Sequence, residues 1–189
     1  MSDKVTAGKP KIGGAVFRAP LGTTLPTSAT AEIDEAFLSL GTISEDGITN
    51  DPSRENEEIK DWAGNVVLET QTSKVDKFKM KFMDHKDVNV LKTIYGDSNV
   101  SGDLESGITV KVNSEELERY AWIIDMVLSG GDLKRVCIPS GKVTEIGEIV
   151  YKGTEAVLFD STISCKPDDD GQTHYEYIKK KPTVASQTT

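Results

Sequence analysis

Residues 75–83, VDKFKMKFM, contain the clearest strand pattern in the chain. Phe78, Met80 and Phe82 alternate with three lysines, so apolar and charged side chains recur at every second position. Successive side chains of a β-strand point to opposite faces, and the pattern therefore predicts a strand with one buried and one solvated face. A sheet built around this strand is the simplest fold for the chain.

An acidic segment, interrupted by glycine and proline, precedes this strand. Residues 45–61 carry seven acidic side chains. Such a polar segment does not bury enough apolar surface to fold on itself. After the small residues 63–65 the chain returns as VVLETQ. The sequence predicts a long hairpin or extended loop, over about residues 42–74, that projects from the domain.

A short helix is predicted directly after the strand, over residues 84–95. Asp84 is the expected N-cap, with Asp87 at the position where a capping box has its second polar group. Apolar side chains at three- and four-residue spacing form the buried stripe of this helix. Gly96 is expected to end it.

The segment 108–139 is compatible with two assignments. Residues 114–128, SEELERYAWIIDMVL, fit a helical stripe and also the two-residue alternation of a strand. Gly130-Gly131 followed by LKRVCIP is typical of a hairpin, and we therefore predict a strand. VTEIGEIVY and AVLFDSTISC form a further hairpin through a turn at 152–154, and THYEYI is the last strand.

The N-terminal part combines a strand, a loop and a second helix. A strand begins at 15–18, a loop rich in proline and glycine follows, and residues 30–40 predict a short helix with Gly41 beyond its end. The expected organisation is a flexible arm (1–11), one domain (12–181) and a flexible tail (182–189). The predicted fold class is mainly β with short helices (α+β), an antiparallel β-sandwich or barrel flanked by a helix.

The charge of the chain bears on its partners. A net charge of −9 argues against nucleic-acid affinity, which comes mainly from lysine and arginine at phosphates. Residues 1–27 carry four basic and one acidic group, whereas residues 28–62 carry two basic and ten acidic groups. A chain divided in this way can attract copies of itself. Cys137 and Cys165 lie in apolar strands without metal-ligand spacing, which indicates buried reduced thiols.

Several motifs follow one another in a characteristic order. Residues 19–26 read APLGTTLP and residues 41–47 read GTISEDG. Further on come Trp122–Asp125, Gly130-Gly131, a Lys-Arg pair, a Val-Tyr-Lys-Gly hairpin and Pro-Asp before Tyr-Glu-Tyr. In this order, over roughly residues 12–179, the motifs resemble the major tail tube proteins of long-tailed bacteriophages.

The resemblance implies a structural virion protein of the phage tail. Six copies would form a ring whose sheets join into an inner barrel, and stacked rings would form the conduit for viral DNA, which passes without specific binding. Tape-measure, tail-tip and tail-terminator proteins are the implied partners. The chain has no apolar run near the about 20 residues of a membrane span and no secretory signal at its N-terminus, so we expect assembly in the host cytoplasm and no membrane binding.

Groups suited to catalysis or ligand binding are sparse. His85 and His174 would act in acid–base chemistry only with a fixed partner. Ser140-Gly141-Lys142 lacks the earlier glycine of a phosphate loop, and the acidic run at 168–170 fails the EF-hand pattern. We therefore predict that the chain is not an enzyme and holds no metal or cofactor.

The charge blocks indicate how copies contact one another. We predict that acids of the projection dock on the basic arm or on the lysine stripe of an adjacent subunit. The acidic candidates are Glu45, Asp46, Asp51, Glu55, Glu57, Glu58 and Asp61, and the basic candidates are Lys4, Lys9, Lys11, Lys77, Lys79 and Lys81. An electronegative bore repels phosphates, and the acids that interrupt apolar strands, Asp125, Glu148 and Asp160, are the lumen candidates.

Other functions stay open at this point. Tube proteins of contractile tails and of secretion systems share the architecture. A small β-sandwich that binds a ligand such as a carbohydrate is a different class, with Trp62, Trp122 and Tyr175 as its stacking platform. An enzyme ranks last, because the sequence lacks a recognisable catalytic motif.

Overall fold

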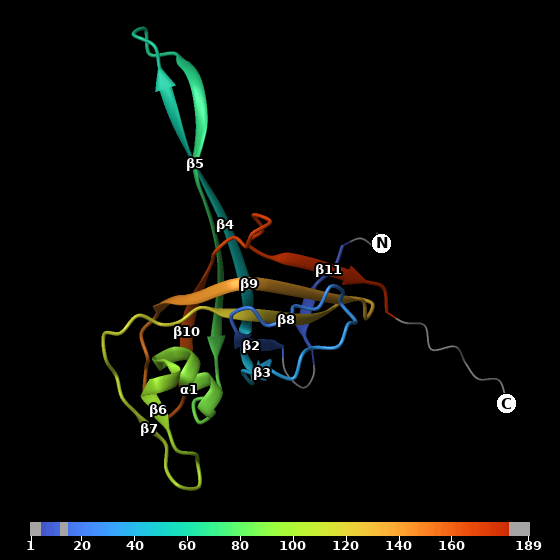
Figure 1. The fold of residues 1–189 in the computed structure, drawn as a ribbon, viewed down its shortest axis with the longest axis vertical. Coiled ribbons are helices and arrows are strands. Elements are labelled where there is room, and N and C mark those ends of the chain that lie inside the picture. The colour runs from blue at the N-terminus through green and yellow to red at the C-terminus, as the bar shows by residue number, and fades with distance from the viewer. Residues whose placement is uncertain (1–4, 12–14, 182–189) are drawn as a thin grey trace, which may run out of the picture.

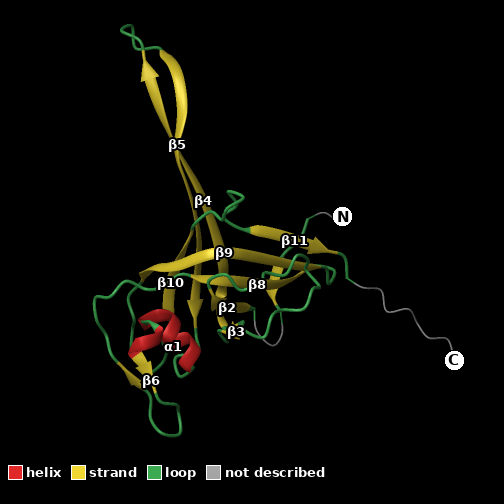
Figure 2. Ribbon diagram, viewed as in Figure 1, coloured by secondary structure: helices red, strands yellow, loops and turns green. Residues whose placement is uncertain are grey.

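A computed structural model describes residues 5–11 and 15–181 (Figures 1 and 2). Lys4 and the predicted C-terminal tail therefore lie outside the described residues. The elements in chain order are β1 (Gly8–Pro10), β2 (Val16–Pro20), β3 (Leu38–Ser39), β4 (Ile43–Lys60), β5 (Val66–Phe82), α1 (Val88–Tyr95), the 3-10 turn η1 (Asp97–Asn99), β6 (Val100–Ser101), β7 (Thr109–Val110), β8 (Tyr120–Leu128), β9 (Leu133–Ile146), β10 (Phe159–Cys165) and β11 (Tyr175–Lys179).

Within the described residues, nine strands form one antiparallel sheet and β6–β7 form a second, small one. The main order is β3-β2-β8-β9-β10-β5-β4, with β1 added to β8 and β11 added to β9. The first half of β9 pairs with β11 and the second half pairs with β10, so the sheet branches there. Figure 1 shows β8, β9 and β11 running across the long axis, along which β4 and β5 project. The predicted fold class, mainly β with a short flanking helix, is confirmed.

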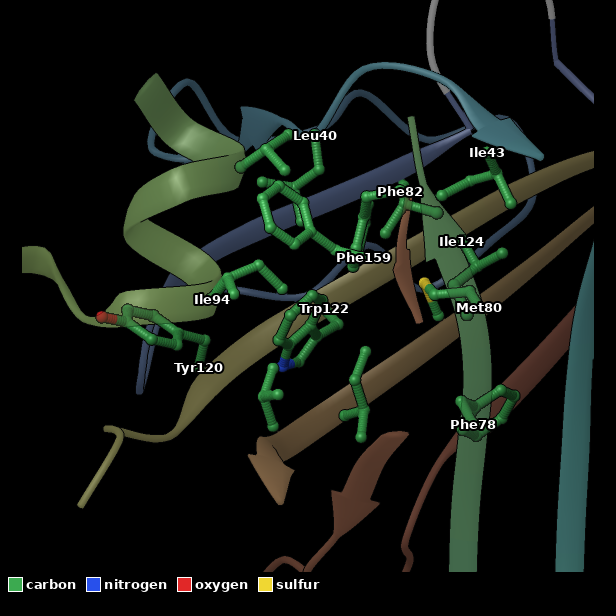
Figure 3. Close-up of a cluster of buried hydrophobic side chains, with 14 of the residues drawn as sticks. Leu40, Ile43, Phe78, Met80, Phe82, Ile94, Tyr120, Trp122, Ile124 and Phe159 are labelled. Atoms are coloured by element: carbon green, nitrogen blue, oxygen red, sulfur yellow. The ribbon is translucent and has the colours of Figure 1, made fainter. Parts of the chain in front are cut away.

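The core lies between α1 and the sheet. Trp122, Phe82 and Phe159 are fully buried there beside Ile94 of α1 (Figure 3). A smaller cluster contains Ala121, Ile123 and Cys137 of β8 and β9 together with Phe37 and Ala19. Because alternate residues of β8 enter different clusters, this strand is buried on both faces, and that explains its unbroken apolar run.

The strand predicted over 114–128 is confirmed for its second part: β8 spans Tyr120–Leu128 and forms the expected hairpin with β9 through Gly130-Gly131. Residues 114–119 belong to a loop instead. β9 continues past Pro139, however, to Ile146. Its register with β8 shifts between Tyr120 and Trp122, and this irregularity accommodates Pro139, which has no N–H for a regular ladder. The predicted turn at 152–154 is part of a longer loop, residues 147–158.

The helix near 84–95 is confirmed, but it begins later than expected. Asp87 is the N-cap, and its carboxylate accepts bonds from the N–H groups of Asn89 and Val90 at 2.7 and 3.2 Å. Asp84 instead accepts a bond from the N–H of Thr42 at 2.7 Å. Gly96 ends the helix as predicted.

The predicted helix at 30–40 is wrong. Ser28 Oγ accepts a bond from the N–H of Ala31 at 3.0 Å, and Asp34 Oδ1 accepts one from the N–H of Ala36 at 2.9 Å. Short polar side chains of this kind compete with helical hydrogen bonds and favour turns. Phe37 and Leu40 enter different core clusters, so the apparent helical stripe does not cover a single face.

Candidate assembly surfaces

The β4–β5 hairpin projects far from the rest of the molecule (Figure 1). β10 accompanies β5 only from Asp76 to Phe82, so residues 53–60 and 66–75 pair only with each other. β4 is also the last strand of its sheet and presents an unpaired edge. A two-stranded ribbon is marginally stable in water, and an open edge readily pairs with another chain. Within residues 5–11 and 15–181, the predicted projection is therefore a hairpin whose outer half pairs with no other strand.

At its base the hairpin is held by charged pairs on the outer face. Lys81 Nζ lies 2.7 Å from Asp46 Oδ2, and Lys79 Nζ lies 3.2 Å from Asp51 Oδ2. The hydrogen bond from Lys81 lowers the pKa of Asp46. Phe78 and the other apolar side chains of the alternating pattern face the core, as predicted. Four residues predicted to contact a neighbour thus pair with one another inside one subunit.

Four of the remaining acidic candidates lie in the outer half of the hairpin, and the fifth, Glu45, lies at its base. Glu55 accepts a bond from Ser73 Oγ at 3.1 Å, and Glu58 lies 3.3 Å from Lys60. Asp61 closes the tip, where its carboxylate accepts bonds from the backbone N–H and side chain of Asn65, which lower its pKa. Glu57 is exposed and makes no ion pair within the described residues.

The end of the hairpin is also apolar, a feature that the sequence analysis missed. Trp62 is 104% exposed. Four neighbours are at least half exposed, and together they form what we call the tip patch: Ile59, Trp62, Val66, Val67 and Leu68. The sequence does contain a signal for this feature, since the apolar run VVL at residues 66–68 follows directly on the turn that begins at Asp61. Exposed apolar side chains gathered in this way are a candidate interaction site.

The N-terminal arm is partly a strand. Gly8 and Pro10 of β1 lie opposite Leu128 and Met126 at the end of β8. Lys9 is exposed, and Lys11 Nζ lies 3.5 Å from Asp125 Oδ2.

A cavity of about 600 Å³ lies between β1, the end of β8 and the base of β4. We call it the arm cavity. Its apolar lining consists of Pro10, Ala15, Ile43, Ile48, Met126 and Leu128.

Comparison with known proteins identifies the family. A family profile described as "Phage tail tube protein" matches residues 5–189. The chain belongs to this family. No curated protein matches the sequence.

Two solved structures of tube assemblies are similar to this tail tube protein. One is the sheath–tube complex of an extracellular contractile injection system, PVC, in its extended state, with 10% identity, a TM-score of 0.44, and coverage of 88% of this chain and 90% of that one. The other is the tube-terminating cap of the anti-feeding prophage, with 9% identity, a TM-score of 0.44, and coverage of 92% and 95%.

Asp125, a lumen candidate of the tail tube protein, is buried, and this prediction is wrong. Its two carboxylate oxygens accept bonds from Arg135 Nε and Nη2 at 2.6 and 2.9 Å. Arg135 Nη1 also donates to the backbone oxygens of Ser28 and Ala31. A buried charge needs such a partner, and this pair fastens the 28–31 loop to the sheet. Glu148 and Asp160 are exposed, as a lumen residue must be.

A second buried acid lies where the hairpin leaves the sheet. Asp76 accepts bonds from Thr173 Oγ1 at 2.6 Å and Asn50 Nδ2 at 2.7 Å, and its Oδ2 lies 2.5 Å from His174 Nδ1. Burial raises its pKa, but these bonds outweigh burial and leave the pKa lowered. Thr173 and His174 both bind the same carboxylate oxygen, so the imidazole does not accept the threonine proton as a catalytic base would.

The other reactive side chains have structural positions. Burial raises the pKa of Cys137 and of Cys165 to about 12, so both thiols are unreactive. His85 stacks on Phe159 with ring centroids 4.6 Å apart. Asp168 closes a turn by accepting bonds from the N–H of Gln172 and from Tyr175 OH.

The described part of the chain contains no group of three or more side chains placed to bind a metal. None of its helices has the length and apolar character of a membrane span. The three aromatic residues considered as a stacking platform for a carbohydrate ligand do not lie together. Trp122 is buried and donates from Nε1 to Gly141 O, Trp62 is at the hairpin tip and Tyr175 is on β11.

Proposed function

We propose that this tail tube protein forms hexameric rings that stack into the phage tail tube and conduct viral DNA into the host. The observation that carries the proposal is the β4–β5 hairpin, which has an open edge and an exposed apolar tip. Contacts with further copies would pair this edge and cover this tip. The family has a structural role in the virion tail, and accordingly we assign the chain no catalytic activity.

A contact made by the open edge of β4 could close copies of the chain into a ring. An edge that pairs with a different surface of the next copy makes a head-to-tail interface, and such interfaces close into rings when the rotation between copies allows it. The number six rests on the resemblance described above. The same resemblance supports tape-measure, tail-tip and tail-terminator proteins as partners.

The acidic balance suits a DNA conduit. Like charges repel within a screening length of about 8 Å at physiological salt, so an electronegative wall keeps the phosphates off the bore. Glu148 and Asp160 are exposed and stay our lumen candidates. Asp160 faces Lys81 across the β10–β5 pair, and this neighbour partly offsets its charge.

Electrostatic docking between copies involves a smaller set of acids than the sequence indicates. Asp46 and Asp51 are already paired within the hairpin. Among the acidic candidates, Glu45 and Glu57 are exposed and make no ion pair within the described residues. Lys9 of the basic arm, which is likewise exposed and outside any ion pair there, is the proposed target of Glu57.

Electron microscopy of the purified protein tests the proposal. We expect rings with sixfold symmetry, or tubes built from them. Stable monomers at all concentrations would contradict it and favour a ligand-binding module.

Charge reversal tests the docking of the acidic hairpin. The variant Glu57→Lys/Glu58→Lys/Asp61→Lys should stay folded and lose tube formation. The control Glu105→Lys/Glu115→Lys/Glu118→Lys makes the same charge change at exposed positions outside the hairpin and should keep it. Normal tubes from the first variant would refute electrostatic docking.

A further inference from the structure

We propose that the tip patch of one copy inserts Trp62 into the arm cavity of a second copy. The inference rests on the proposed tube function and specifies which surfaces join successive copies. It assigns the anchoring role to apolar side chains, with the acids of the hairpin in a secondary role.

The tip patch has the character of an anchor. Trp62 is wholly exposed, and Ile59 and Leu68 lie directly opposite each other on the two strands behind it. Tryptophan is strongly enriched among the few residues that dominate binding energy at interfaces, because it buries a large apolar area. Placing five apolar side chains at the end of an acidic projection has no benefit for an isolated subunit.

Other exposed apolar side chains do not form a comparable feature. Leu104 and Val112 lie singly in loops, and Tyr151 has only the less exposed Val150 beside it. Single exposed apolar residues are normal on protein surfaces.

The arm cavity has the size and chemistry to receive this anchor. Its volume of about 600 Å³ is in the range of about 300–1,000 Å³ that is usual for binding pockets. The walls are mainly apolar, with Met126 and Leu128 on the β8 side and Ile43 and Ile48 on the β4 side. Methionine adapts its shape easily and suits a surface that must accept an aromatic ring.

The charges around the cavity fit an acidic tip on one side. Lys9 of β1 lines the cavity and makes no ion pair within the described residues. Glu45 and Asp46 are on the opposite, β4 wall, and Lys134 of β9 also lines the cavity. Asp46 is paired with Lys81, and Lys134 with Glu176. Asp61, next to Trp62, would therefore approach the β1 wall. Because β1 supplies both this lysine and Pro10, the receptor is incomplete when the arm is absent.

The positions of donor and acceptor suit a repeating assembly. One end of β4 borders the cavity and the other end is at the tip, separated by 17 residue steps, or roughly 55 Å at about 3.3 Å per residue. Donor and acceptor are thus different surfaces at opposite ends of one element. A contact between them is head-to-tail, and its repetition joins each copy to the next along the hairpin direction.

Photo-crosslinking in assembled tubes tests the pairing directly. Trp62 is replaced by the photoreactive aromatic residue benzoylphenylalanine, and assembly uses a mixture of isotopically light and heavy chains so that links between copies are recognised. We expect mixed light–heavy links to peptides that contain residues 5–11, 43–48 or 126–134. Links to another surface, or no links between copies in intact tubes, would overturn the inference.

A pair of variants measures the contribution of the anchor. Trp62→Ser/Leu68→Ser should raise the protein concentration needed for tube formation at least about tenfold, as loss of a central anchor does. The control Leu104→Ser/Val112→Ser removes two other exposed apolar groups and should leave this concentration unchanged. Deletion of residues 1–11 should act like the tip variant, because it removes the β1 wall.

These results separate the two proposals. If the unmodified protein forms no rings or tubes, the proposed function fails. If it forms tubes, and the tip variant forms them at the same concentration as the control, only the docking of Trp62 in the arm cavity fails.

Discussion

The two tryptophans of this chain mark two regions with opposite requirements. Trp122 is 0% exposed in the sheet body, where α1 covers it and Gly141 accepts its N–H. Trp62 stands free at the end of a two-stranded ribbon. The body buries its large apolar side chains and pairs its charges within one subunit. The hairpin leaves the apolar side chains of its end exposed, and its ion pairs lie at the surface. This contrast is why we propose that the hairpin completes its interactions through other copies.

The largest expected effect is the difference in unfolding free energy between substitutions of the two tryptophans. Trp122→Ala should lower the free energy of unfolding by about 3–5 kcal/mol, because it leaves a cavity in the core. Trp62→Ala in the unassembled subunit should change it by less than about 0.5 kcal/mol, as exposed substitutions do. Chemical denaturation of both variants measures the difference. Equal losses would erase the distinction between the two regions.

Breaking the buried ion pair of the body should cost nearly as much. Asp125→Ala leaves Arg135 charged and without its main partner, and the expected loss is about 3 kcal/mol. The double variant Asp125→Leu/Arg135→Met removes both charges and should be more stable than the single variant. A double variant that loses the full sum of the two single changes would contradict this account of the pair.

Low pH should destabilise the protein through Asp76, which lies at the junction of the hairpin and the body. The pKa of Asp76 is lowered in the folded state, so its contribution to stability is present above the ordinary pKa of 3.8 and is lost as the pH falls through the lower, folded value. Asp76→Asn should flatten this part of the pH dependence. The measurement is the denaturation midpoint of both proteins between about pH 5 and about pH 2. Parallel curves would show that Asp76 is not the group responsible.

The smallest effect is expected from the surface pairs of the hairpin. Lys79→Gln, which removes the partner of Asp51, should change the free energy of unfolding by at most about 1 kcal/mol, and less at high salt. A larger loss would mean that the base of the hairpin depends on its own charges. Denaturation at low and high salt distinguishes these outcomes.

Local periodicity predicted the elements that one pattern dominates. The alternation at 75–83 correctly identified the strand and its buried face, because the pleat fixes side-chain direction. The pair Gly130-Gly131 decided between helix and strand for β8. At 30–40 the spacing of apolar residues resembled a helix, but the polar side chains of Ser28 and Asp34 form turns instead.

Properties that depend on tertiary partners were harder to predict. Asp125 in an apolar strand is consistent with a wall residue and also with a buried ion pair. The register of the β8–β9 hairpin decides between these two roles. Asp125 and Arg135 are five residues to either side of Gly130, and they pair directly across the hairpin. The internal pairing of Asp46 and Asp51 likewise follows only once the register of β4 with β5 is known.

We propose that the hairpin obtains its stability from neighbouring copies, whereas the body supplies its own. Amide hydrogen exchange, measured on unassembled subunits and on tubes, tests it most directly. We expect β8 and β9 to be protected in both states, while residues 53–60 and 66–75 exchange rapidly in the subunit and become protected in tubes. Equal protection of the hairpin in both states would contradict it.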